Sequence, residues 1–142
     1  MKYVIGMVVL FAALNVSATQ QIKELFRVGD ETVEIRQYPL KDYLEQSTLP
    51  DTMKRPICSA NWRGYRGSWT VKNRMLVLDH LVVNACSKTP IPIEARDLFS
   101  NHRYPVVATW YTGTIMVRAP GSGYIAYRFD KGELISTALV DQ

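Results

Sequence analysis

The chain has 142 residues, of which 47% are hydrophobic and 21% are charged, and its formal net charge at pH 7 is +4. This length is that of one domain, and the composition excludes a disordered, collagenous or coiled-coil protein. Two cysteines and two histidines are too few for a disulfide-dense scaffold or a four-cysteine zinc site.

The first eighteen residues have the pattern of a secretory signal peptide. Lys2 is their only charge, an apolar run covers residues 3–14, and small residues end at Ala18, where a signal peptidase would cut. The run is too short for a bilayer, which needs about 20 residues, and no later stretch is apolar enough. We expect cleavage after Ala18 and a single globular domain over residues 19–142. The alternative is a buried N-terminal strand or an uncleaved anchor.

The next elements are a hairpin and a short helix. Strand-like runs at residues 22–28 and 31–36 flank a Gly-Asp pair, which is typical of a tight turn. A proline then precedes a predicted helix over residues 40–46, whose apolar side chains share one face. Residues 47–57 contain two prolines and no periodicity, so we expect a surface connection.

The middle of the chain predicts two long antiparallel strands. They cover residues 61–72 and 75–83, and a polar, turn-like stretch joins them. Gly64 and Gly67 lie inside the first strand, where they indicate a bulge or a close backbone approach.

The rest of the chain is also rich in strand-forming residues. A loop at residues 84–89 and a helical turn within 94–99 precede a long strand over 106–118, and strands at 124–129 and 133–139 close the domain. We therefore predict a mainly β protein, with α+β as the alternative. About seven antiparallel strands would form a curled sandwich or open barrel with one or two short helices. The connections lack crossover helices, which argues against parallel strands.

The two cysteines predict one disulfide bond. Cys58 and Cys86 both lie after the predicted cleavage site, and an isolated pair in an exported protein is typically oxidised. Two buried thiols in separate strands are the alternative.

Three sequence blocks occur in a familiar order. They read YPLxxYL at 38–44, WRGYxxxW at 62–69 and PVxAxWYxGTI at 105–115, where x is any residue. In this order they resemble a group of small bacterial proteins of unknown function, over most of the chain after the signal peptide. The resemblance supports the predicted fold, but it does not indicate which activity the protein has.

A block rich in aromatic residues and arginines is the clearest candidate for a binding surface. Such side chains can stack on sugar rings or anchor a protein interface. The alternative places Trp62 and Trp69 in the core and the arginines in solvent. A further alternative is that Arg63 is a buried ion-pair partner of an acid such as Asp79. The candidate residues are Trp62, Arg63, Tyr65, Arg66, Trp69, Trp110 and Tyr111.

No motif in the sequence predicts catalysis, a metal or a cofactor. Asp79 and His80 are neighbours on a predicted strand, so they point to opposite faces, and we expect His80 to be a core or edge residue. His102 lies in a polar loop, and Ser68 and Ser122 lie beside glycines without forming a nucleophile elbow. The basic residues are scattered among acids, which argues against nucleic-acid binding.

These observations favour an exported, non-catalytic binding protein in the periplasm or outside the cell. The best candidate is an inhibitor or immunity-type protein, which neutralises a toxin or hydrolase by protein–protein contact. A carbohydrate- or cell-wall-binding module is the alternative, followed by an envelope structural protein or a hydrolase with an unfamiliar site.

Overall fold

The structure is a computed structural model, and it describes residues 19–54, 58–100 and 103–141. The predicted signal peptide lies outside these residues. The described chain forms a mainly β, nine-stranded open sheet with only short helices, in the order β2-β1-β3-β4-β9-β8-β7, while β5 and β6 pair with β4. The predicted fold class is confirmed. Nine strands form rather than about seven, because residues 91–92 form a strand that was not predicted and the predicted strand over 106–118 is divided in two.

The N-terminal hairpin is confirmed. Strands β1 (Glu24–Val28) and β2 (Glu31–Ile35) pair in antiparallel fashion. Gly29 adopts φ +58° in the turn between them, a conformation that glycine adopts without steric cost. Helix α1 (Lys41–Glu45) follows, within the predicted range.

The long central hairpin consists of β3 (Tyr65–Lys72) and β4 (Met75–Val83). Its two-residue turn places Asn73 and Arg74 at φ +49° and +63°, as in a type I′ turn. The register shifts between Ser68 and Trp69, where β4 carries one extra residue, Asp79, that has no partner on β3. The strand starts later than predicted because residues 61–64 form a turn, in which the Gly64 N–H bonds to the Asn61 carbonyl at 2.9 Å.

One strand pair differs from the prediction of a purely antiparallel sheet. β1 and β3 run parallel, with Phe26 opposite Trp69. A parallel pair needs a long crossover connection. Here the connection contains β2, α1 and a 3₁₀ helix (Asp51–Met53). Only the segment that holds the 3₁₀ helix was expected to be a surface connection.

The predicted strand over residues 106–118 is also wrong in its middle. It divides into β6 (Val106–Val107), a turn, and β7 (Gly113–Arg118). In the turn the Tyr111 N–H bonds to the Ala108 carbonyl at 2.9 Å. β5 (Ile91–Pro92) and α2 (Ala95–Leu98) precede this segment.

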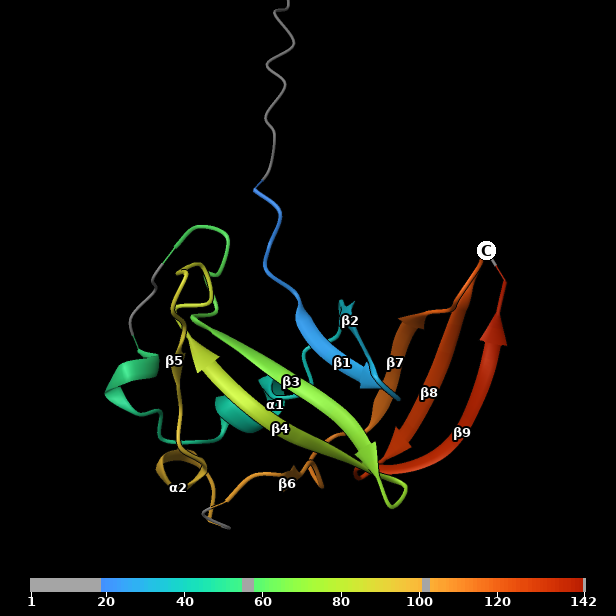
Figure 1. Cartoon of the computed structure of the whole chain (residues 1–142). Coiled ribbons are helices and arrows are strands. Elements are labelled where there is room, and N and C mark those ends of the chain that lie inside the picture. The colour runs from blue at the N-terminus through green and yellow to red at the C-terminus, as the bar shows by residue number, and fades with distance from the viewer. Residues whose placement is uncertain (1–18, 55–57, 101–102, 142) are drawn as a thin grey trace, which may run out of the picture.

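The chain ends in a three-stranded meander of β7, β8 (Tyr124–Asp130) and β9 (Glu133–Val140). The meander lies at one side of the molecule, with β5 and α2 at the other (Figure 1). Its ladder to the central hairpin has a single pair, Met75 with Glu133. The core fills the space between the sheet's parts, and its largest fully buried side chains include Trp69, Phe26 and Phe129.

The sheet curls, so that its two end strands approach each other. The rings of Phe26 on β1 and Tyr127 on β8 lie 5.3 Å apart between their centroids. The Met116 N–H of β7 bonds to the side-chain oxygen of Gln37, just after β2, at 3.2 Å. In the part of the chain that the structure describes, no β-ladder joins β2 and β7. The predicted curled sheet is thus open between these strands.

The predicted disulfide bond is confirmed. Cys58 and Cys86 are bonded, with their Cα atoms 6.6 Å apart. The bond ties the turn before β3 to the loop after β4. Disulfides are typical of proteins in oxidising compartments.

Candidate functional site

The predicted aromatic and arginine-rich surface is divided between the core and the exterior. Tyr65 and Trp69 are 5% and 1% exposed and belong to the core, whereas Trp62 is 67% exposed. Arg63 donates to the Ile22 carbonyl at 2.6 Å and stacks 3.7 Å above the ring of Tyr38. Arg66 is partly exposed.

The other two candidates lie elsewhere, in the turn before β7. Trp110 is half-buried, donates to the Pro39 carbonyl at 2.8 Å and packs against Tyr43. Tyr111 packs near Phe129, with 6.1 Å between ring centroids. Burial raises the pKa of Tyr111 to about 12, so its hydroxyl stays protonated at neutral pH. The sequence predicted a strand here, on which Trp110 and Tyr111 would point to opposite faces, but the two residues lie in the segment between β6 and β7.

The sequence suggested Arg63 as a partner of Asp79, but Asp79 pairs with two other residues. Its carboxylate contacts Arg27 at 3.2 Å and Lys72 at 2.7 Å, which makes it an ion-pair residue. His80 is exposed rather than in the core, and a ring nitrogen contacts the Asp79 carbonyl. His102 lies outside the described residues. Within the described ranges, no group of three or more His, Cys, Asp or Glu side chains is placed to hold a metal ion.

A buried carboxyl group that the sequence analysis did not single out lies beneath the central hairpin. Glu24 is fully buried, and its Oε2 accepts a bond from the indole N–H of Trp69 at 2.5 Å. Burial is the main reason that its pKa rises to about 7, and the bond from Trp69 opposes the rise. The alternation of Glu24 with Phe26 along β1 is the sequence signal for its inward direction.

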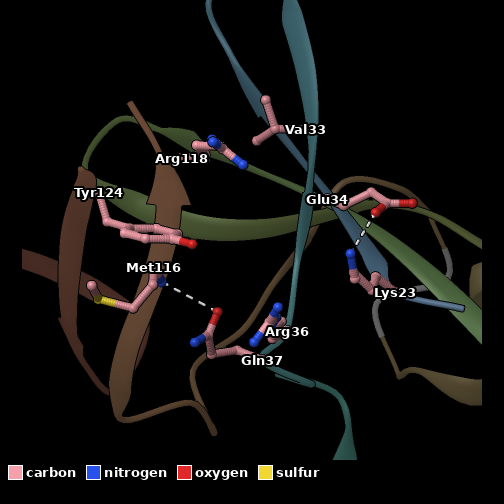
Figure 2. A pocket seen from close by; sticks show the side chains of 8 residues that line it. All are labelled: Lys23, Val33, Glu34, Arg36, Gln37, Met116, Arg118 and Tyr124. Carbon is pink, nitrogen blue, oxygen red and sulfur yellow. Dashed lines mark hydrogen bonds and ion pairs between the residues drawn. The ribbon is translucent and has the colours of Figure 1, made fainter. Parts of the chain in front are cut away.

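A concave surface of the described chain is a groove between β2 and β7. It has a volume of about 600 Å³, which is within the range of ligand pockets. Figure 2 shows side chains of both strands facing one another across it. The groove is lined by Lys23, Val33, Glu34, Arg36, Gln37, Met116, Arg118 and Tyr124.

The groove carries an excess of positive charge. Lys23 and Glu34 form an ion pair at 2.9 Å, which neutralises one of its three cations. Arg36 and Arg118 are both exposed, and neither lies within 4 Å of a carboxylate oxygen of the described residues. A guanidinium group can bind a carboxylate with two parallel hydrogen bonds. The groove can therefore attract and hold acidic groups.

The groove also exposes the free backbone edge of β7. The bond from the Met116 N–H to Gln37 shows that the peptide groups of Met116 point away from β8. Since peptide groups alternate in direction along a strand, those of Thr114 and Arg118 also point away from β8, and Arg118 lines the groove. An extended peptide can pair with such groups.

None of the groove's cations was singled out from the sequence. Lys23 precedes β1, Arg36 follows β2 and Arg118 ends β7, so in the sequence each looks like an ordinary solvated residue beside or at the end of a strand. They meet only because the sheet curls.

None of the helices in the described part of the chain has the length and apolar character that a membrane crossing requires. The chain matches no family model, and no curated protein or solved structure is significantly similar to it.

Proposed function

We propose that this protein is an exported binding protein of the periplasm or the extracellular space. It acts by contact with another protein rather than by catalysis. The specific form that we favour is an inhibitor or immunity-type protein, which covers the site of a toxin or hydrolase. The main support is the groove between β2 and β7, where two arginines without carboxylate partners flank a free strand edge.

The groove suits an extended, acidic segment of the partner. The backbone of the segment would pair with the free edge of β7, and its carboxylates would bind Arg36 and Arg118. Such contacts need shape and charge but no reacting group. The disulfide supports an oxidising compartment, and the predicted signal peptide supports export.

The test is affinity capture from the host's periplasmic extract with three forms of the protein. We expect the wild type to retain a stoichiometric protein partner, and Arg36→Gln with Arg118→Gln to lose at least nine-tenths of it. Retention should fall with added salt, because salt screens charge. Arg128→Gln with Lys131→Gln is the matched control, since it removes two exposed cations of the same meander outside the groove.

Equal capture by the wild type and the double arginine variant would contradict the role of the groove. An absence of any protein partner would contradict the proposal as a whole.

The alternative of a glycan-binding module has one observation in its favour, the exposed ring of Trp62. It would stack on a sugar ring, with Arg63 and Tyr38 beside it as a positioned pair. Trp69 is buried and Trp110 is half-buried against other rings, so these two add no exposed platform. Retention on peptidoglycan that disappears in Trp62→Ala would favour this alternative.

A further inference from the structure

The outer edge of β9 is open over most of its length. β9 pairs with β8 along one edge, but on the other edge the ladder to β4 contains only Met75 with Glu133. Each residue of Ile135–Val140 is exposed, and Ile135 and Leu139 are 52% and 68% exposed. β9 borders the outside of the meander (Figure 1).

This edge lacks the features that usually prevent strands from pairing with other chains. Natural edge strands carry charges, prolines or bulges that interrupt pairing. Residues 134–140 contain no charge and no proline, and the bulge of β9 lies at its start, opposite Arg128 and Phe129. From Ser136 onward the strand is regular.

The direction of the free peptide groups follows from the register of the meander. The peptide groups of Met116 point away from β8, so those of its partner Ala126 point toward β9. Ala126 lies opposite Ala138, whose peptide groups are therefore used by β8. The groups of Thr137 and Leu139 point outward and are available to a new strand.

We infer that β9 pairs with β9 of a second copy of this chain, in antiparallel fashion about a twofold axis at Ala138. In this register Thr137 of each chain lies opposite Leu139 of the other. Both residues present an outward N–H and C=O, so four backbone hydrogen bonds form. The two Ala138 side chains meet at the closely spaced, non-hydrogen-bonded position, where small residues fit.

The side chains of β9 support a second copy as the occupant. The pairing places Leu139 against the Thr137 methyl group, and Ser136 against Val140, on opposite faces of the extended sheet. No charged residue between Leu134 and Val140 has to lose its hydration. The contact is short, so we infer a reversible dimer of the transient class. The inference does not depend on the proposed function, because β9 lies outside the groove.

The first test is sedimentation of the full-length chain, purified as the cell processes it, from about 1 μM to 1 mM. We expect the mass to rise from monomer toward dimer with concentration. Leu139→Lys should remain monomeric, and Thr114→Lys should behave like the wild type. Thr114 is a matched control because it is an exposed threonine at the far edge of the same meander. A wild type that is monomeric at every concentration would overturn the inference.

The second test examines the register by mild oxidation of variants that each carry one added cysteine. In Ala138→Cys the two new cysteines face each other about 4.5 Å apart between Cα atoms, within reach of a disulfide. In Thr137→Cys each new cysteine faces Leu139, so little cross-linking is expected. Cys58 and Cys86 do not interfere because they are bonded to each other. Cross-linking of Thr137→Cys but not of Ala138→Cys would overturn the inferred register.

Discussion

At the scale of single residues, the buried carboxyl group of Glu24 makes the stability of the fold depend on pH. Its Oε1 has no hydrogen-bond partner among the described residues, while Oε2 accepts from Trp69. Charging this group costs free energy because water is excluded, which is why its pKa lies at about 7 rather than 4.5. In the folded chain Glu24 thus binds a proton that the unfolded chain releases near pH 4.5.

Stability should therefore depend on pH through Glu24. A carboxyl group whose pKa is raised on folding destabilises the folded chain most at pH values where the group must ionise. Its contribution to the free energy of unfolding falls as pH rises from about 4.5 and levels off above about pH 7. The total is about 3 kcal/mol at about 1.4 kcal/mol per pKa unit.

The variant Glu24→Gln isolates this effect. Its amide oxygen can still accept the bond from Trp69, but it does not titrate. Relative to the wild type, we expect the variant to gain about 3 kcal/mol of unfolding free energy between pH 4.5 and 8, measured by urea denaturation. Glu31→Gln, which removes an exposed carboxylate of β2, is the control. Parallel pH profiles for the wild type and Glu24→Gln would show that Glu24 ionises normally.

At the scale of elements, the tight turns determine how the strands pair. Lys131 and Gly132 connect β8 to β9 with φ values of +46° and +83°. Glycine adopts this conformation readily, whereas lysine does so at a cost. The Lys131 N–H also bonds to the hydroxyl of Thr112 at 2.9 Å, which holds the turn against the start of β7.

Substitution of Lys131 should reveal this backbone cost. Asparagine tolerates the left-handed region, so Lys131→Asn should raise the free energy of unfolding by roughly 0.5–1 kcal/mol. Valine tolerates the left-handed region poorly, so Lys131→Val should lower the free energy of unfolding by roughly 1–2 kcal/mol. Urea denaturation of both variants provides the measurement. The reverse order of stability would show that the side chain, rather than the backbone conformation, controls this turn.

The elements also show where local sequence was informative. The hairpins at Gly29 and at Asn73 were predictable, because a turn residue between two strand-forming runs is a local signal. The break between β6 and β7 was not. Its sequence is rich in β-forming residues, but Trp110 packs on Tyr43 and bonds to Pro39, and these contacts favour a turn there. Tertiary contacts override strand propensity at this position.

At the scale of the whole molecule, the candidate site is a product of curvature. Arg36 directly follows β2 and Arg118 ends β7, two strands at opposite ends of the sheet order, and each arginine looks like an ordinary solvated residue in the sequence. The curl of the sheet brings them to one groove, where the side chain of Gln37 accepts a hydrogen bond from the backbone of β7. Nothing in the sequence alone indicates that β2 and β7 lie side by side, so the site could not be predicted from it. The sequence did predict the disulfide and the mainly β class.

The most direct test of the central claim is amide hydrogen exchange of the protein with and without its captured partner. If the partner pairs with the free edge of β7, exchange should slow by at least tenfold at the N–H groups of Thr114 and Arg118. The neighbouring residues of β2 should also be protected, and the turn at Trp62 should be unchanged. Protection confined to the turn around Trp62, with β7 unaffected, would contradict the account and place the binding surface elsewhere.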